Sequence, residues 1–391
     1  MIAYKIREGI YWVGAIDWHL RLFHGYSTDK GTTYNAYLIL DEKITLIDNV
    51  KAEFTEELIA RISSVIDPSK IEVIISNHGE PDHSGSLPKI LELAPNAKVY
   101  CSSPNGVKIL NAIYGDIPII PVKTNDTLSI GKRTLQFIQA PMVHWPDNMV
   151  TYIPEEKILF SNDIYGQHYA TAKLFDSGND LATIIHEAKK YYANIVLPYT
   201  KQANKYNDLI KDFDIEMIAT AHGVIWKDNL KEILALYDDL LNSRKKEKAI
   251  IVYDSMWGNT DVMARNIMEA FMEKGIEVRL YNINNTEDSD IITEIVDAKY
   301  LAVGSSTLNN NMLPKIAGFL YYLKGLAPVD LQYIAFGSYG WGGQSIKQIS
   351  DFLDGIGYKP LIEPVKMLYN PTTDGLTSLK QAIFLALDQQ K

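Results

Sequence analysis

The chain has a single cysteine, Cys101, among its 391 residues. One thiol excludes an internal disulfide. It also excludes an iron–sulfur cluster or a tetrathiolate iron held by this chain alone, because each needs about four thiolates. Cys101 follows a short apolar run, so we expect it to be a small buried residue near a strand end rather than a nucleophile.

Long apolar runs and an excess of basic residues are also missing. No apolar stretch approaches the roughly 20 residues that a membrane-spanning helix needs. The N-terminus lacks the charged and then apolar regions of a signal peptide. We therefore expect a cytoplasmic protein without a membrane partner. The net charge of −10 disfavours nucleic acid as a partner, because phosphate binding needs a basic face.

Histidine is missing from the C-terminal part of the sequence. All eight histidines lie between His19 and His222, so imidazole-dependent metal chemistry belongs to the N-terminal part. The chain is too long for one ordinary core, which predicts two domains. The polar, charged run 242–248 is typical of a solvated linker and predicts domains at 1–248 and 249–391.

The N-terminal part alternates short strands with helices. Two antiparallel hairpins are expected, at 36–47 and 128–138. This mixture predicts a sandwich of two sheets covered by helices. The expected strands are 34–40, 44–48, 71–76, 98–100, 135–139, 149–153, 158–160 and 195–198, with helices at 53–65 and 181–193.

The C-terminal part shows regular strand–helix alternation, which predicts a doubly wound parallel sheet. The expected strands are 249–253, 278–281, 300–303, 333–336 and 361–365. The expected helices are 261–274, 290–297, 314–325, 345–356 and 376–388.

The segment 76–85 is the most informative of the N-terminal part. It places His78, Glu80, Asp82 and His83 within six positions, directly after the apolar run 71–75. A strand that ends in a turn with several N and O ligands predicts a metal site. Two imidazoles and two carboxylates without a thiolate suit iron or manganese at least as well as zinc.

Three further candidates each follow an apolar strand, at what we expect to be the same edge of the sandwich. They are His144, Asp163 and His222. A mononuclear site needs about four ligands, whereas these residues together suffice for two metal ions. The three carboxylates and one bridging hydroxide would neutralise two divalent metal ions, which a pocket of low dielectric favours.

The first loop of the C-terminal domain predicts a phosphate site. It follows the strand 249–253, opens a helix, and offers hydroxyls, an amide and freed backbone N–H groups. It lacks the Walker lysine and the GxGxxG pattern, which favours FMN over ATP or NAD. Loops after the third and fourth strands lie where a ligand binds in such a sheet. The candidate FMN-binding residues are Ser255, Met256, Trp257, Gly258, Asn259, Thr260, Ser305, Ser306, Thr307, Leu308, Asn309, Asn310, Ser338, Tyr339, Gly340, Trp341 and Gly342.

These motifs resemble those of a known family. The His-x-Glu-x-Asp-His segment resembles the metallo-β-lactamase signature, with Glu80 in place of the second histidine, and in this form it is similar to the flavodiiron proteins. The 253–260 loop resembles the flavodoxin phosphate loop. The resemblance implies an α/β chain, with an N-terminal metallo-β-lactamase-like αββα sandwich followed by a flavodoxin-like doubly wound parallel sheet.

The resemblance also implies cofactors and ligands. Two Fe ions, in a non-haem diiron site with an oxo or hydroxo bridge, would accompany FMN. One iron would be held by His78, Glu80 and His144, and the other by Asp82, His83 and His222. Asp163 would bridge the two irons. His24 lies in a segment similar to one close to the irons in the family, which suggests a contact with a ligand or with substrate.

By the same resemblance, the protein would reduce dioxygen to water, or nitric oxide to nitrous oxide, with electrons passing through FMN. The electron donor would be a separate protein or cofactor, rubredoxin or a reduced deazaflavin. A head-to-tail homodimer or a dimer of dimers is expected. Two alternatives remain open at the level of sequence: a dizinc hydrolase with an appended flavodoxin-like module, and an electron-transfer protein whose metal site is only structural.

Overall fold

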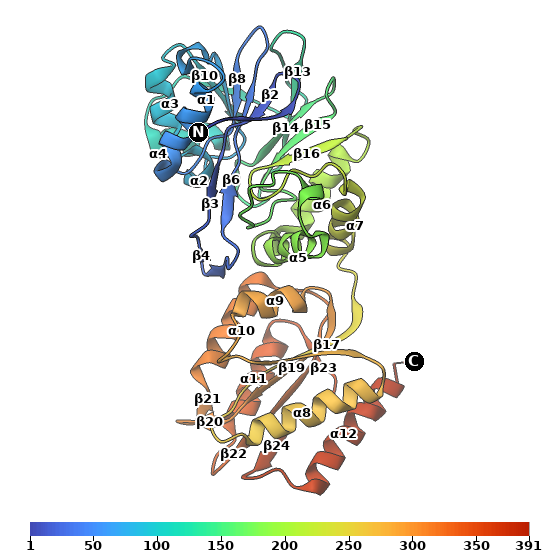
Figure 1. The fold of residues 1–391 in the computed structure, drawn as a ribbon. Coiled ribbons are helices and arrows are strands. Elements are labelled where there is room, and N and C mark those ends of the chain that lie inside the picture. The colour runs from blue at the N-terminus through green and yellow to red at the C-terminus, as the bar shows by residue number, and fades with distance from the viewer. Residues whose placement is uncertain (391) are drawn as a thin grey trace. The chain divides into compact units, whose positions relative to one another are not determined.

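The computed structural model describes residues 1–390, and the chain divides into two compact units. The first unit comprises Met1–Tyr192 and Tyr199–Leu241. The second comprises Ala193–Pro198 and the residues from Asn242 onward. Each unit has its own sheets (Figure 1), and the buried apolar residues of each unit form separate clusters.

The first unit is built on two sheets. The seven-stranded sheet has the order β1-β2-β7-β8-β9-β10-β11, with antiparallel pairs from β1 to β8 and parallel pairs from β8 to β11. Its strands are β1 (Tyr4–Arg7), β2 (Ile10–Trp12), β7 (Tyr37–Ile39), β8 (Thr45–Ile47), β9 (Val73–Ser76), β10 (Lys98–Ser102) and β11 (Ile119–Val122).

The five-stranded sheet has the order β12-β13-β14-β15-β16, antiparallel except for the parallel pair of β15 and β16. Its strands are β12 (Thr127–Ser129), β13 (Thr134–Gln139), β14 (Met149–Ile153), β15 (Ile158–Asn162) and β16 (Met217–Thr220). Both predicted hairpins are confirmed, as β7–β8 and β12–β13.

Alternate residues of the strands build two cores. Ile75 and Tyr37 of the first sheet pack against Phe137 and Phe160 of the second, between the sheets. The neighbouring Ile74 faces the other way, toward the helices that cover the first sheet. The helices of this unit are α1 (Thr55–Ser63), α2 (Pro81–Ser84), α3 (Leu87–Leu93), α4 (Asn105–Tyr114), α5 (Leu181–Tyr191), α6 (Thr200–Ile210) and α7 (Leu230–Leu241). This is the predicted sandwich covered by helices.

Two small ribbons complete the first unit. β3 (Ala15–Asp17) pairs with β6 (Thr32–Tyr34), and β4 (Leu22–Phe23) pairs with β5 (Tyr26–Ser27). The β4–β5 hairpin is visible in Figure 1 as a short loop extending from this unit.

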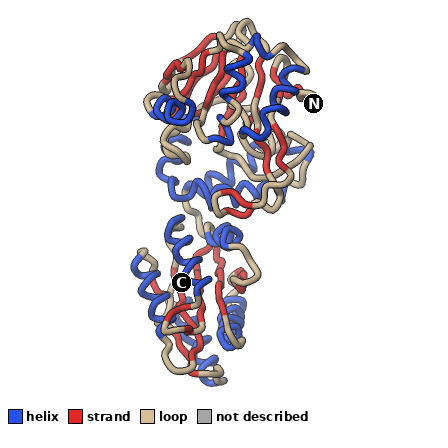
Figure 2. Tube along the Cα trace, turned by 90° about the vertical axis from the view of Figure 1, so that its left-hand side faces the viewer, coloured by secondary structure: helices blue, strands red, loops and turns tan. Residues whose placement is uncertain are grey.

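The second unit is the predicted doubly wound parallel sheet, with strand order β18-β17-β19-β22-β23 and with β24 paired to β22. Helices α8 and α12 pack on one face. The strands form one layer between helices in Figure 2. The elements are β17 (Lys246–Asp254), α8 (Asn259–Glu273), β18 (Glu277–Asn282), α9 (Asp288–Ile295), β19 (Ala298–Ser305), β20 (Thr307–Leu308), β21 (Asn311–Met312), α10 (Pro314–Leu326), β22 (Gln332–Tyr339), α11 (Gln344–Gly355), β23 (Lys359–Pro360), β24 (Val365–Leu368) and α12 (Thr373–Asp388).

Three local predictions were wrong. The run 195–198 is not a strand, because it continues α5 as a π turn and a 3-10 turn. The expected strand 361–365 is mostly a gap between strands, because β23 ends at Pro360 and β24 begins at Val365; Pro364, in that gap, has no N–H for a sheet. The run 242–248 is not wholly a solvated linker, since its last three residues begin β17 and Lys248 is buried against Glu294 and Asp297.

Candidate metal and flavin sites

The predicted metal-ligating residues all follow strands whose ends lie at one edge of the sandwich. His78 and Glu80 follow β9, with Asp82 and His83 in the short helix α2. The other three lie after β13, β15 and β16, as His144, Asp163 and His222. Six of the seven are buried, and His144 is partly exposed.

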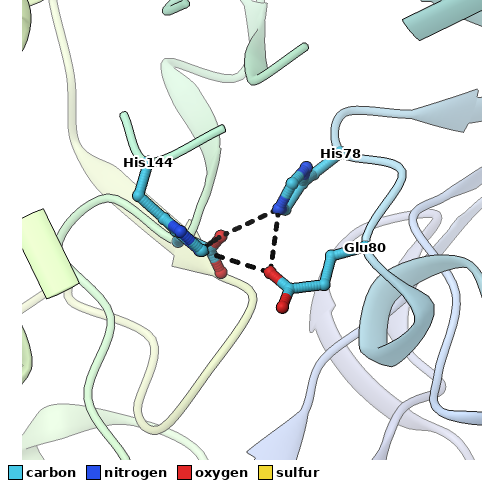
Figure 3. Close-up of side chains that lie close together, drawn as sticks. His78, Glu80 and His144 are labelled. Atoms are coloured by element: carbon cyan, nitrogen blue, oxygen red, sulfur yellow. Dashed lines mark hydrogen bonds and ion pairs between the residues drawn. The ribbon is translucent and has the colours of Figure 1, made fainter. Parts of the chain in front are cut away.

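His78, Glu80, His144 and Asp163 form the first cluster, in which ligand atoms converge. The Nε2 atoms of His78 and His144 lie 3.1 and 3.3 Å from Oε2 of Glu80. Figure 3 shows these three side chains pointing toward one another. His144 Nε2 also lies 3.3 Å from Oδ2 of Asp163.

Asp82, His83 and His222 form the second cluster. His222 Nε2 lies 3.3 Å from Oδ2 of Asp82. The other oxygen of Asp163, Oδ1, lies 2.9 Å from His83 Nε2 and 3.6 Å from His222 Nε2. Asp163 thus directs one oxygen to each cluster.

Several buried polar atoms of this pocket lack hydrogen-bond partners among the described residues. They include both carboxylate oxygens of Asp82 and Asp163 and both ring nitrogens of His83. Such atoms cost several kcal/mol when left unpaired in a protein interior. Their lone pairs converge without hydrogen-bond geometry between them. The residues therefore fit a pair of metal cations.

The pKa values show that the pocket stabilises positive charge. Burial by itself would lower the pKa of His83, but Asp82 and Asp163 outweigh it and raise that pKa to about 9. Burial would raise the pKa of Asp163, yet the neighbouring His83 and His144 hold it well below its ordinary value. Protons or metal cations can supply this positive charge.

Asp147 contacts this site, although the sequence analysis did not find it. Its Oδ1 accepts a hydrogen bond from Nδ1 of His78 at 3.1 Å, and its Oδ2 accepts one from the backbone N–H of Gly79 at 2.6 Å. Asp147 is buried and lies three residues after His144. Its closeness to His144 is the only feature of the sequence that could have indicated a role for Asp147 at this site.

His222 and His168 have neutral partners. Nδ1 of His222 donates to the backbone oxygen of Thr33 at 2.6 Å, and Thr32 Oγ1 lies 2.9 Å from Nδ1 of His168. Burial and the adjacent His222 hold the pKa of His168 well below its ordinary value. His168 is therefore a neutral ring that packs beside a predicted ligand.

His24 lies at the tip of the β4–β5 hairpin, where its φ of 51° is in the left-handed region. Its side chain is exposed, but Nε2 lies 3.0 Å from Oε1 of Glu80. The structure therefore brings His24 into contact with a predicted ligand.

The second unit has a pocket of about 460 Å³ at the carboxyl ends of its central strands. Trp257 and Trp341 line it and remain 87% and 89% exposed, so two indole rings are available to an aromatic ligand. Eleven of the predicted FMN-binding residues line it: Met256, Trp257, Asn259, Ser306, Thr307, Leu308, Asn309, Ser338, Tyr339, Gly340 and Trp341.

Six predicted residues do not line the pocket. Gly258, with a φ of 83°, precedes α8 and allows the turn into it. Ser305 accepts a hydrogen bond from the N–H of Leu313 and so supports its own loop. The remaining four are Ser255, Thr260, Asn310 and Gly342. Tyr369, after β24, lines the pocket but was not predicted, because the fifth strand was misplaced.

A network of hydroxyl groups supports the phosphate loop. Thr260 Oγ1 is buried, lies 3.2 Å from Ser306 Oγ, and accepts a hydrogen bond from the N–H of Ser338 at 3.4 Å. This residue therefore joins all three pocket loops. Ser255 Oγ is buried and has no partner among the described residues. An unpaired hydroxyl at a helix N-terminus fits a phosphate group.

Comparison with known proteins finds similarity to both units. A family model described as "ODP family beta lactamase" matches residues 32–223, and a flavodoxin model matches residues 251–381. The chain is 44% identical to a nitric oxide reductase of Moorella thermoacetica, over 92% of this chain and 91% of that one. It is similar to the solved rubredoxin oxygen:oxidoreductase of Desulfovibrio gigas, with a TM-score of 0.95 and 41% identity over 99% and 98% of the two chains. The flavodiiron protein of Giardia intestinalis also has a TM-score of 0.95, with 35% identity over 99% and 96%.

The chain belongs to the flavodiiron protein family.

As a flavodiiron protein it is an oxidoreductase with a diiron site and FMN, which agrees with the unpaired atoms found at both sites. Within residues 1–390, no helix has the length and apolar character to span a bilayer.

Proposed function

We propose that this flavodiiron protein reduces dioxygen to water, or nitric oxide to nitrous oxide, with electrons delivered through FMN. The main support is that one chain combines two convergent metal-ligand clusters with a flavodoxin-type pocket. A hydrolase needs no supply of electrons, and relatives named as oxidoreductases decide against the dizinc hydrolase.

In this proposal the first iron would be held by His78, Glu80 and His144, and the second by Asp82, His83 and His222. Asp163 could serve both, since each of its oxygens faces one cluster. The three carboxylates offset most of the charge of two ferrous ions, so the complete site is close to neutral.

When bound, the two irons can each supply one electron and FMN two, which together match the four-electron reduction of dioxygen. The protein fixes the metal ligands in place because they lie on buried loops that follow the strands. Seven protein ligands do not fill the coordination positions of two irons, so a diatomic gas has room to bind.

His24 is proposed to hold Glu80. Its Nε2 lies 3.0 Å from Oε1, which leaves Oε2 of Glu80 facing His78 and His144. Because the side chain of His24 is 69% exposed, it is also placed between solvent and the site.

FMN is proposed to bind in the pocket of the second unit. The 255–260 loop would take the phosphate through the hydroxyl of Ser255 and backbone N–H groups, while Trp257 or Trp341 would pack on the ring. The proposed FMN-binding set remains the seventeen residues predicted from the sequence, of which eleven line the pocket, with Tyr369 added.

The proposal extends to partners and location. The electron donor is rubredoxin or a reduced deazaflavin, and one relative is named a rubredoxin-oxygen oxidoreductase. Because the two sites lie in different units, a head-to-tail homodimer or a dimer of dimers would let one chain serve another. The protein is proposed to act in the cytoplasm. Sedimentation with activity assays tests the assembly, and a fully active monomer would contradict it.

The test of the proposed function is anaerobic. Protein with measured iron, zinc and FMN is photoreduced, mixed with dioxygen or nitric oxide, and followed by the rate of iron reoxidation and by the products. We expect water or nitrous oxide from the native protein, and loss of gas reduction in His222→Ala. A native protein that holds two zincs and no iron, or that leaves both gases unreduced, contradicts the proposal.

A further inference from the structure

The two proposed metal positions have similar ligands, but the hydrogen-bond partners of those ligands differ. Each cluster provides two imidazoles and one carboxylate, with Asp163 between them. A difference between the positions can therefore come from the groups behind the ligands. A partner on the far nitrogen of a ligating imidazole fixes its tautomer and raises its basicity.

The first position has a charged partner behind it. Asp147 Oδ1 lies 3.1 Å from Nδ1 of His78 and accepts its proton, which leaves Nε2 free to face Glu80. The Asp147 side chain is only 2% exposed, so its negative charge acts with little screening.

The second position has weaker partners. His222 Nδ1 donates to a neutral acceptor, the backbone oxygen of Thr33. His83 Nδ1 is buried and finds no partner within residues 1–390. The buried carboxylate of Asp48 does not serve as such a partner. It accepts hydrogen bonds from the amides of Asn77 and Asn162, at 2.8 to 3.3 Å, and none from an imidazole.

Asp147 also joins the two loops that carry the ligands of the first position. Its Oδ2 accepts the N–H of Gly79 at 2.6 Å, between His78 and Glu80. Its own loop carries His144. Gly79 permits this approach, because a Cβ there would lie 3.1 Å from Oδ2 of Asp147.

The geometry points to Asp147 as the positioning residue that makes the two metal positions unequal, so that the position of His78, Glu80 and His144 binds its metal more tightly than that of Asp82, His83 and His222. The inference rests on the proposed diiron function. Loss of a partner behind a ligating histidine typically reduces metal affinity about 10- to 100-fold. We expect that loss at the first position alone.

Asp147→Asn removes the negative charge of this side chain and keeps its size and shape. The amide has one oxygen, which can accept from Gly79 or from His78 but not from both in the native arrangement, and it carries no charge. Asp176→Asn is the matched control. Asp176 is equally buried and accepts from the backbone N–H groups of Asp228 and Asn229, but it contacts no predicted ligand.

The experiment titrates metal-free, full-length protein with Co²⁺ against a competing chelator, without oxygen. The native protein should bind in two steps that differ about tenfold or more in affinity. In Asp147→Asn the first position should weaken about 10- to 100-fold, so the tighter step of the titration should weaken at least about tenfold, while Asp176→Asn should match the native protein. One equivalent of ⁵⁷Fe²⁺ should give one Mössbauer doublet in the native protein, and in Asp147→Asn a second doublet should replace part or all of it.

Two single-position variants test the inference with Asp147 intact. His222→Ala keeps the first cluster whole and His78→Ala keeps the second, so the former should bind Co²⁺ about tenfold more tightly. Equal affinities overturn the inference, whether or not Asp147→Asn folds. An unchanged titration of Asp147→Asn also overturns it. If the native protein binds two irons and reduces a gas, these failures leave the proposed function standing, whereas native protein without iron refutes that function itself.

Discussion

Removal of the metals should make the stability of the first unit depend on pH. The carboxylates around His83 raise its pKa from the ordinary 6.5 to about 9. Below pH 6.5 the folded and unfolded chains both bind this proton, and the stabilisation is fully present. As the pH rises toward 9 the unfolded chain releases the proton while the folded chain keeps it, so stability is lost.

The size of the effect follows from the shift. Raising the pKa from 6.5 to about 9 corresponds to about 3 kcal/mol, at 1.36 kcal/mol for each pH unit. The pKa values of His78 and His144 are raised too, so both residues act in the same direction. In metal-loaded protein the imidazoles bind cations instead of protons, and the free energy of unfolding should change little over this range.

Hydrogen exchange measured by mass spectrometry between pH 6 and 9.5 can test this in the intact chain. Peptides that cover β9, β15 and β16 report on the first unit, after correction for the intrinsic exchange rate. Peptides of the second unit are an internal control, because no histidine follows His222 in the sequence. A metal-free first unit whose protection does not fall between pH 6.5 and 9, or falls only as much as that of the control peptides, would refute the reasoning.

Four substitutions give further expected outcomes. Asp163→Asn should lose both metals, because its oxygens face both clusters; retention of two irons by elemental analysis would contradict this. Glu80→His should shift competitive loading from Fe²⁺ toward Zn²⁺, since imidazole replaces a harder carboxylate. Thr260→Val should weaken FMN binding about fivefold, for about 1 kcal/mol per lost hydrogen bond, whereas Thr377→Val on the exposed face of α12 should not. Trp341→Ala should weaken FMN binding by a similar factor, since an aromatic pair contributes about 1 kcal/mol beyond the area that it buries; unchanged affinity by fluorescence titration would exclude stacking.

The metal ligands could be predicted because their signals are local. A histidine or carboxylate directly after a buried apolar strand is visible in one short segment, as with His144 and Asp163, and strand ends of one sheet edge meet in space. Asp147 shows the limit. Its role depends on a contact with His78, 69 residues away in the sequence, and no local pattern marks that contact.

The elements that were predicted wrongly have other causes, one for each element. The run 195–198 is short and apolar, and such a run has no periodicity that separates a strand from a buried helical turn. Lys248 was assigned to a solvated linker because of its charge. In the folded chain its amine is paired with Glu294 and Asp297, which allows a strand to begin among charged residues. Pairing of this kind is decided by tertiary structure.

The two exposed indoles of the flavin pocket give the protein a built-in optical probe. Of the six tryptophans in the chain, Trp257 and Trp341 are the only ones after residue 241, and both line that pocket. The emission of the second unit therefore arises next to the place where FMN is expected to sit. Occupancy of the pocket should be readable from tryptophan quenching in unlabelled protein.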